Sequence, residues 1–274
     1  GVTGPNEYEN NINNNWYTNY LAQWCLNYTI EQISKVSKSH KEKWEKIKAK
    51  LNWNDIELER WKEIADNIYF PKHPKEDLFL QQDGFLDKVL TPASSLNPNE
   101  RPINQHWSWD RILRSPFIKQ ADVLQGFYIF KDHFDYATLK RHFDFYEPLT
   151  VHESSLSPCI HSILAAHLGK KDLAYELFLQ TSRLDLDDYN SEVEEGLHIT
   201  SMAGTWMSIV EGFGGLRVLN NQLYLNPILP KPWKGYKFKI NFRGTLITIK
   251  VGKNQVDVFH NNKDLKVNCQ GKWI

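Results

Sequence analysis

The chain has 274 residues, which is enough for a substantial core and one or two domains. Its 33 basic and 33 acidic residues balance, so charge gives no reason to expect nucleic acid or an anionic membrane as a partner. The three cysteines lie far apart and form neither a metal-ligand spacing nor a disulfide framework, and no apolar stretch is long enough to span a bilayer. This cysteine usage fits a reducing compartment, so we expect a cytoplasmic location.

Three helices are predicted near the start of the chain. Residues Asn15 to Ile33 carry apolar side chains at three- and four-residue steps, which is typical of an amphipathic helix. Two helices rich in Lys and Glu should follow, from Ser37 to Leu51 and from Asn54 to Ile68. Their charged residues are expected to form solvated faces.

A long irregular region is predicted from Phe70 to Pro116, because six prolines interrupt it. Within it, Leu78 to Leu86 is predicted to form a short hairpin around Asp83-Gly84. Helical periodicity then resumes, and Gly169 is placed to end one of the helices. The predicted helices are Lys119 to Phe130, Tyr136 to Tyr146, Ser155 to Leu168, Lys171 to Leu184 and Ser201 to Gly212.

After Gly215 the period of the apolar residues changes from helical to two, which predicts strands. The predicted strands are Leu216 to Val218, Gln222 to Leu225, Tyr236 to Phe242, Thr245 to Val251 and Gln255 to His260. Asn220-Asn221, Arg243-Gly244 and Asn261-Asn262 are the predicted turns. The sequence therefore predicts a mainly α protein with a C-terminal antiparallel β unit, divided into residues 1–218 and 219–274.

Four short polar clusters are candidates for chemistry. Gly4-Pro5-Asn6-Glu7 presents a carboxylate ahead of a helix, and Lys119-Gln120-Ala121-Asp122 offers two long donors and a carboxylate suited to sugar hydroxyls. Residues 150–157 carry His152, Glu153, Ser154 and Ser155, and a fourth cluster runs from Glu195 to His198. Isolated polar residues near helix ends usually cap or pair, so each cluster alone also has a purely structural explanation.

Paired hydroxyls at a helix start suit a tetrahedral anion such as phosphate, because free backbone N–H groups point the same way. Ser154 and Ser155 precede the apolar run Ile160 to Leu168, so they could equally be no more than helix caps. The ten histidines show no ligand spacing, and we expect no metal.

Taken together and in order, the clusters resemble the inverting disaccharide phosphorylases of glycoside hydrolase family 65, which includes maltose, trehalose and kojibiose phosphorylases. The matching strings are GPNEY, NNNWYTNYLAQW, IKQADV, YEPLTVHESSLSPCIHSILAAHLG, AYELFLQTSRLDLDD, EGLHITSMAGTWMSIVEGFGGLRV, LYLNPILPKPW and FRGTLITI. They cover nearly the whole chain except Ser34 to Arg114.

The resemblance implies that the chain is the second half of an (α/α)6 barrel followed by a small antiparallel β-sheet or sandwich domain. Part of the sugar subsite would then lie in the missing half of the barrel. We therefore expect this chain alone to be inactive or nearly so, and the intact protein to be a homodimer.

Carried over position by position, the resemblance assigns the general acid to Glu7, although the family often has Asp where this chain has Asn6. Lys119 and Gln120 match residues that hold the sugar where the bond breaks. Ser154, Ser155 and His198 match the phosphate site. The implied substrates are an α-linked glucose disaccharide and inorganic phosphate as co-substrate, with β-glucose 1-phosphate as a product and no cofactor.

Two alternatives remain open. A hydrolase of the same family would need a base to activate water, and Glu153 or Glu195 could be nominated, although Glu153 also fits a structural role. The chain could instead be a non-catalytic sugar-binding fragment. The linkage of the disaccharide does not follow from these motifs, because maltose, trehalose, kojibiose and nigerose phosphorylases share them.

Overall fold

The first long helix begins at a side-chain cap. In the computed structural model, which describes residues 1–274, helix α1 (Trp16–Ser39) follows Asn15, whose side-chain oxygen accepts a hydrogen bond from Thr18 N at 2.9 Å. Trp16 is fully buried and stacks on Tyr20 and Phe127. The predicted helix is confirmed, and it continues six residues beyond Ile33.

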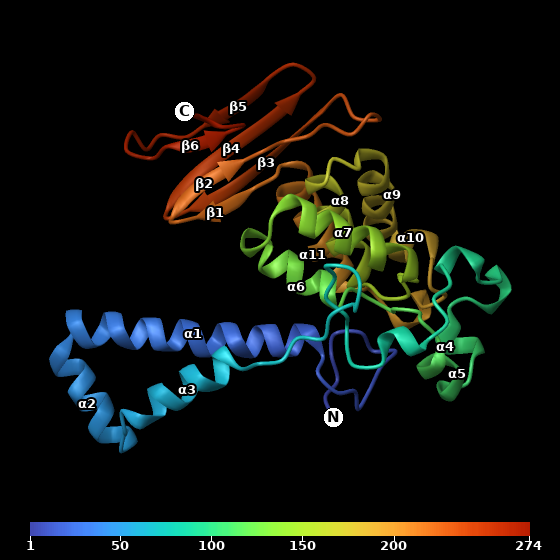
Figure 1. Cartoon of the computed structure of the whole chain (residues 1–274). Coiled ribbons are helices and arrows are strands. Elements are labelled where there is room, and N and C mark those ends of the chain that lie inside the picture. Colours follow the sequence, from blue (N-terminus) through green and yellow to red (C-terminus); the bar gives the residue numbers. More distant parts are fainter.

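Helices α2 (Lys41–Leu51) and α3 (Ile56–Asp66) fold back beside α1 to make an arm that projects from the rest of the molecule (Figure 1). Contacts between α1 and α3 hold the arm together. Trp53 packs edge-on between Trp44 and Trp61 at its far end. Both helices confirm the prediction, each with a later start.

The region from Phe70 to Pro116 is irregular, as predicted, but the expected hairpin around Asp83-Gly84 is wrong. An isolated antiparallel β-bridge lies earlier, between Lys72 and Phe79, and the chain reverses between these two residues. Gly84 instead adopts a left-handed conformation (φ 72°) that leads into a single 3-10 turn, Phe85–Asp87. Two short helices, α4 (Ile103–His106) and α5 (Trp109–Arg114), end the region.

The body of the molecule is built from helices that pack in neighbouring pairs around one hydrophobic core. Helix α6 contacts α7, and α8 contacts both α9 and α11. The bounds are α6 Val123–Ile129, α7 Tyr136–Tyr146, α8 Ser157–His167, α9 Lys171–Ser182, α10 Leu184–Asp187 and α11 Ile199–Met207. Gly169 (φ 74°) ends the segment that carries α8, as predicted.

Four of the five helices predicted after Pro116 differ from the structure at their ends, two of them by several residues. Lys119 and Gln120 precede α6 rather than opening it: Ile118 pairs with Thr150 in a parallel bridge, and the chain bends at Lys119 and Gln120 before the helix begins. The helix predicted to reach Gly212 ends at Met207 and continues as a π-helical segment, η7 (Ser208–Phe213).

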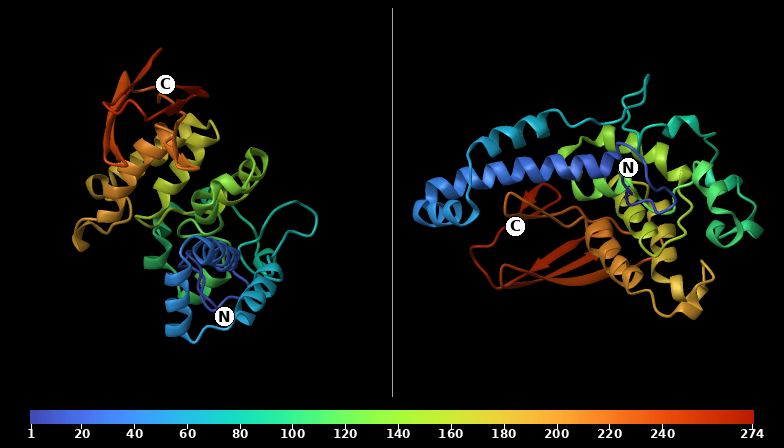
Figure 2. Two further views of the ribbon diagram at one scale, coloured as in Figure 1. Left: turned by 90° about the vertical axis from the view of Figure 1, so that its left-hand side faces the viewer. Right: turned by 90° about the horizontal axis from the view of Figure 1, so that it is seen from below.

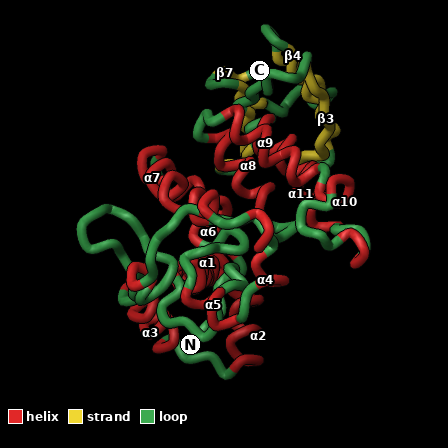
Figure 3. Tube along the Cα trace, turned by 90° about the vertical axis from the view of Figure 1, so that its right-hand side faces the viewer, coloured by secondary structure: helices red, strands yellow, loops and turns green.

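The last part of the chain forms two small sheets, which lie together at one end of the molecule (Figures 1 and 3). One sheet has the order β1-β2-β6-β7 and the other β3-β4-β5. All pairings are antiparallel except that of β2 with β6. The strands are β1 Arg217–Leu219, β2 Gln222–Leu225, β3 Gly235–Phe242, β4 Thr245–Gly252, β5 Val256–Phe259, β6 Val267–Cys269 and β7 Lys272–Trp273.

Five of these strands were predicted, whereas β6 and β7 were not. Asn220-Asn221 and Arg243-Gly244 make tight turns with positive φ at both residues, as hairpins require. Asn261-Asn262 lies at the start of the loop that leads to β6. The predicted domain division between 218 and 219 falls inside β1 and stays a prediction.

An aromatic cluster joins the β unit to the helices. Trp233 packs edge-on against Phe178 of α9 and Phe213 of η7, with ring centroids 5.3 and 5.1 Å away. The hydroxyl of Tyr236, in β3, donates to Phe213 O at 2.6 Å. The arm and the β unit extend from different sides of the helical body (Figure 2). The mainly α fold with a C-terminal β unit is thus confirmed, and no helix is both long and apolar enough to cross a bilayer.

Candidate active site

The loop that carries Glu7 lies against the loop that carries Lys119. The Lys119 ammonium is 2.6 Å from Glu7 Oε2, and the Lys119 backbone N–H donates to Asn6 Oδ1 at 3.0 Å. The Glu7 side chain is 56% exposed and that of Lys119 21%. The structure therefore brings together two residues 112 positions apart and leaves the Glu7 side chain open to solvent.

A buried polar frame holds the Glu7 loop from behind. Asp122 accepts hydrogen bonds from Asn6 N (3.1 Å) and from the Asn15 side chain (2.9 Å). Burial raises the pKa of the Asp122 carboxyl to about 7, while these hydrogen bonds oppose the rise. Gly4 is required here because a Cβ at this position would lie 2.4 Å from Asn15 Nδ2 and 2.5 Å from Asp122 Oδ2.

Gln120 is turned toward the same loop. Its side-chain amide donates to Pro5 O at 2.9 Å, and its other amide atom, Oε1, is buried without a protein partner. Only 6% of Gln120 is exposed. In this arrangement Gln120 supports the loop that carries Glu7, and its Oε1 remains an unused hydrogen-bond acceptor.

The residues that lead from His152 through Ser154 and Ser155 to α8 are called the serine segment. It begins at His152, which has a left-handed backbone (φ 57°). Ser154 and Ser155 are not the caps of α8: the cap position belongs to Leu156, with no side-chain cap bond, and the helix starts at Ser157. Ser154 Oγ accepts from Leu156 N at 3.2 Å, and Ser155 Oγ lies 2.6 Å from Thr200 Oγ1. The Ser155 hydroxyl therefore faces the start of α11.

His198 stands at that start, as the residue before α11, and its ring is held by Asp185. Its Nδ1 is 2.6 Å from Asp185 Oδ1, and its backbone N–H donates to Asp185 Oδ2 at 3.0 Å. A hydrogen on Nδ1 satisfies the carboxylate, so Nε2 points away from Asp185. The nearest acid to Nε2 is Glu192, whose Oε2 is 3.7 Å away and which an anion bound to Nε2 would have to displace.

Glu153 connects the loop that carries Glu7 to the serine segment. Its side chain is 3% exposed and accepts hydrogen bonds from Tyr8 Oη (2.8 Å), Ile103 N (2.9 Å) and Arg101 Nε (3.0 Å). Tyr8 follows Glu7 directly, and Glu153 precedes Ser154. Burial and the Glu153 carboxylate raise the pKa of the Tyr8 hydroxyl, so it remains a donor. With both oxygens engaged and little access to solvent, Glu153 is built as a brace rather than as a base for water.

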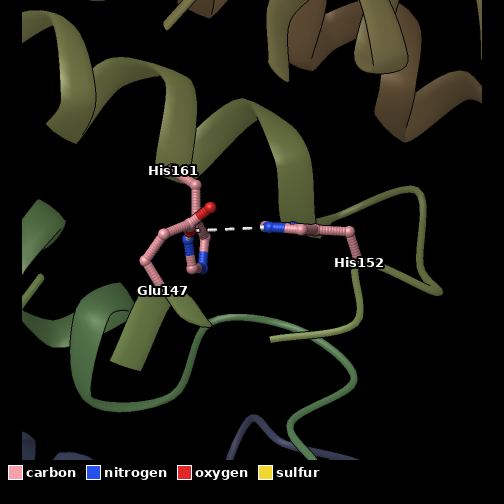
Figure 4. Close-up of side chains that lie close together, drawn as sticks. All are labelled: Glu147, His152 and His161. Atoms are coloured by element: carbon pink, nitrogen blue, oxygen red, sulfur yellow. Dashed lines mark hydrogen bonds and ion pairs between the residues drawn. The ribbon is translucent and has the colours of Figure 1, made fainter. Parts of the chain in front are cut away.

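A second cluster of titratable groups, Glu147, His152 and His161, lies beneath the serine segment (Figure 4). Two imidazoles and a carboxylate are a ligand set that zinc can use. Here, however, His161 Nδ1 is hydrogen-bonded directly to Glu147 Oε2, so two of the three candidate ligand atoms are joined to each other. This arrangement is that of a hydrogen-bonded ionic network.

A cleft of about 550 Å³ lies beside the serine segment. It is lined in part by Glu147, His152 and Glu153, and by none of the six predicted site residues. The paired side chains, and not this cavity, therefore define the candidate site.

Sequence reasoning missed the partners that hold the site. Asp185, Thr200 and the cluster under the serine segment come from separate helices and loops, so no local spacing reveals them. Only Asp185 could have been suspected from the sequence, because it lies in the acidic run of residues 184–188, within one of the strings that resemble family 65.

Comparison with protein families gives two matches. The model described as the glycosyl hydrolase family 65 central catalytic domain covers residues 1–207, and that of the family 65 C-terminal domain covers residues 216–274.

Individual relatives agree with this result. The maltose phosphorylase of Bacillus subtilis is 52% identical over 93% of this chain, and an alpha,alpha-trehalose phosphorylase of Thermoanaerobacter brockii is 42% identical over 93%. The chain spans about a third of the length of these curated relatives, 33% of each. A solved structure, described provisionally as a kojibiose phosphorylase from the human microbiome, matches all of this chain with a TM-score of 0.91 and 40% identity; the match covers 36% of that chain.

Proposed function

The chain belongs to glycosyl hydrolase family 65, and from this we propose that its parent protein cleaves an α-linked glucose disaccharide with inorganic phosphate, releasing β-glucose 1-phosphate. Maltose is the first substrate to test, because the Bacillus subtilis relative is named maltose phosphorylase. Inorganic phosphate is a co-substrate in this proposal, and no cofactor takes part.

The observation that carries the proposal is the meeting of the serine segment with the start of α11. Ser155 reaches Thr200 at 2.6 Å, two residues after His198, and Asp185 holds the His198 ring by its Nδ1. An imidazole fixed in this way can direct a charge-assisted hydrogen bond from Nε2 to an anion. Ser154, Ser155 and His198 are therefore assigned to phosphate.

Inverting cleavage by water needs two carboxyl groups, one as acid and one as base. Phosphate is already an anionic nucleophile, so phosphorolysis needs only the acid. We assign the acid to Glu7, which would protonate the departing oxygen, and assign Lys119 and Gln120 to holding the sugar beside it. Because Lys119 contacts Glu7 Oε2 in the structure, this ion pair would have to open for that oxygen to approach the departing one.

A closed pocket around Glu7 would have to come from residues outside this chain. We therefore expect residues 1–274 alone to lack turnover, and we propose that the parent acts as a cytoplasmic homodimer. We retain the division into a catalytic part, residues 1–218, and a β domain, residues 219–274.

The test is release of glucose 1-phosphate from a panel of α-linked glucose disaccharides, with and without phosphate, by the full-length parent. We expect release that depends on phosphate, and the active disaccharide names the linkage. Free glucose at equal rates in both conditions would replace phosphorolysis with hydrolysis.

Two glutamates provide a matched pair of variants. Glu7→Gln should reduce turnover by roughly 10³-fold or more, because an amide cannot protonate the leaving oxygen. Glu195→Gln should retain activity, because Glu195 is exposed in a turn and has no role in phosphorolysis. Loss of activity in Glu195→Gln with retention in Glu7→Gln would reverse both assignments.

A further inference from the structure

Glu147, His152 and His161 form a network that none of the proposed catalytic roles uses. Glu147 follows α7, His152 opens the serine segment and His161 lies on α8, so the network ties three elements together (Figure 4). His161 Nδ1 bonds to Glu147 Oε2, and His152 Nε2 lies 3.5 Å from the same oxygen. The two imidazole rings are nearly perpendicular, with centroids 4.6 Å apart.

The protonation of His161 follows from its surroundings. The side chain has no exposed surface, and its Nε2 is buried with no partner. A hydrogen on Nε2 would be an unsatisfied buried donor, so the hydrogen belongs on Nδ1, where it is donated to Glu147. Burial lowers the pKa of His161, which keeps the ring neutral. Burial raises the pKa of Glu147, but the two histidines outweigh this and lower it well below its usual range.

The His152 ring has a hydrogen-bond partner at one nitrogen and a longer contact at the other. Its Nδ1 lies 2.8 Å from the hydroxyl of Ser157, the first residue of α8. Its Nε2 is buried without a hydrogen-bond partner and faces Glu147 Oε2 at 3.5 Å. The ring thus spans from the Glu147 carboxylate to the start of α8, across the turn that contains Ser154 and Ser155.

This anchoring matters because His152 has an unfavourable backbone. Its φ of 57° is uncommon for a residue with a side chain and persists only when the surroundings fix it. The left-handed residue sets the direction in which the next residues leave. The positions of Ser154 and Ser155 therefore depend on the contacts that hold the His152 ring.

We propose that Glu147 and His161 are positioning residues for the phosphate site, acting through His152 to fix the turn that presents Ser154 and Ser155. Neither residue need touch phosphate. The inference rests on the proposed function, since it assigns the turn a role only if phosphate binds there.

The test compares two substitutions of one residue in the full-length parent. His161→Asn places an amide donor close to the former Nδ1, whereas His161→Leu fills a similar volume without a donor. We expect His161→Leu to raise the KM for phosphate about tenfold and to leave the KM for the disaccharide within about twofold, because the acid and sugar residues lie on other segments. His161→Asn should restore most of the affinity for phosphate.

Two further variants complete the design. His167→Leu is the matched control, because this exposed histidine lies on the same helix and outside the network. His152→Asn tests the link directly: Asn tolerates the left-handed backbone and can reach Ser157 but not Glu147. It should raise the KM for phosphate as His161→Leu does, whereas His167→Leu should not.

The outcomes separate this inference from the function on which it rests. Equal phosphate KM values for the Leu and Asn variants of His161, or a parallel rise in both KM values with a lower Tm, would mean that the network serves stability alone and would overturn the inference. Turnover by the unmodified protein that does not depend on phosphate would overturn the proposed function itself and, with it, this role.

Discussion

Single residues in this chain act through partners that are far away in the sequence. The hydroxyl of Tyr8 reaches Glu153, 145 positions later, at 2.8 Å. That contact places the residue after the proposed acid beside the residue before the proposed phosphate serines. Under the proposed mechanism, this contact would link the loop of the acid to the segment that binds phosphate through a side chain that performs neither role.

The Tyr8 contact gives a prediction at this scale. Tyr8→Phe removes one hydrogen bond to a buried carboxylate while leaving those from Arg101 and Ile103. We expect kcat of the full-length protein to fall roughly tenfold with a smaller change in KM, because the acid is displaced in the transition state.

Steady-state kinetics with maltose and phosphate check this, and Tyr28→Phe, on the exposed arm, is the control. An unchanged kcat in Tyr8→Phe would show that the brace does not set the position of the acid.

Residue-level prediction from the sequence succeeded where a motif is continuous and failed where geometry is assembled from distant parts. Glu7 and Lys119 were named separately and are found paired. His161 lies on the predicted helix Ser155 to Leu168, yet it forms a network with Glu147 and His152, at spacings that follow no helical or strand period. Such a set is created by the packing of α7 against the serine segment and α8, which a sequence pattern does not encode.

At the scale of elements, His142 shows how a helix fixes the loop beside it. It lies on α7, where Nδ1 faces Thr138 O at 2.7 Å, and Nε2 accepts the Phe79 N–H at 2.7 Å. A ring that accepts at Nε2 carries no hydrogen there, so it must be neutral. Burial lowers the pKa of His142 to about 4.

This neutral histidine predicts a loss of stability in acid. Between pH 6.5 and about 4 the unfolded chain binds a proton on His142 and the folded chain does not, so the free energy of unfolding falls as the pH is lowered. A pKa shift of this size corresponds to about 3 kcal/mol of unfolding free energy for a fully buried group.

Urea unfolding at pH 7.5 and pH 5 measures this effect. His142→Gln should lose less stability between the two pH values than the wild type, whereas the exposed His40→Gln should match the wild type. Equal losses in the wild type and His142→Gln would assign the acid sensitivity to other groups, such as His161 or His167, whose pKa values burial also lowers.

The elements themselves were predicted unevenly. Tyr136–Tyr146 and Gln222–Leu225 match the structure at both ends, because each carries a clear period and a flanking turn or cap. Lys119 and Gln120 were misplaced in a helix because the parallel bridge between Ile118 and Thr150, a tertiary contact, fixes the chain just before them and the helix begins only at Val123. Strands β6 and β7 are only three and two residues long, which is too short to show a period.

For the whole molecule, the helices and the β unit are joined by an aromatic cluster and by Val210 of η7, which is buried in the core of the β unit. Trp233 lies within 5.9 Å, centroid to centroid, of Tyr175, Phe178, Phe213 and Tyr236. The backbone oxygen of Phe213 also accepts a hydrogen bond from Ile228 N at 2.7 Å. The two parts should therefore unfold together as long as this cluster is intact.

Removing the tryptophan should uncouple them. Trp233→Ala is expected to destabilise the protein by about 3 kcal/mol, because it leaves a cavity in a partly buried aromatic cluster. Calorimetry should then resolve separate transitions for the helical part and the β unit, whereas the exposed Trp273→Ala should preserve the wild-type profile. A single transition in Trp233→Ala at an unchanged Tm would show that other contacts make the joint.

The order of strands in the first sheet has a consequence for biosynthesis. Strand β2 pairs with β1 as soon as the Asn220-Asn221 turn forms, but its other edge is covered only by β6, in parallel register from Leu223–Val267 to Leu225–Cys269. On the ribosome, β2 emerges well before that partner, and an uncovered edge of Leu223 and Leu225 can pair with another nascent chain. Translation that stops before Val267 would leave a template for aggregation, so synthesis of β6 protects the protein from association with other nascent chains.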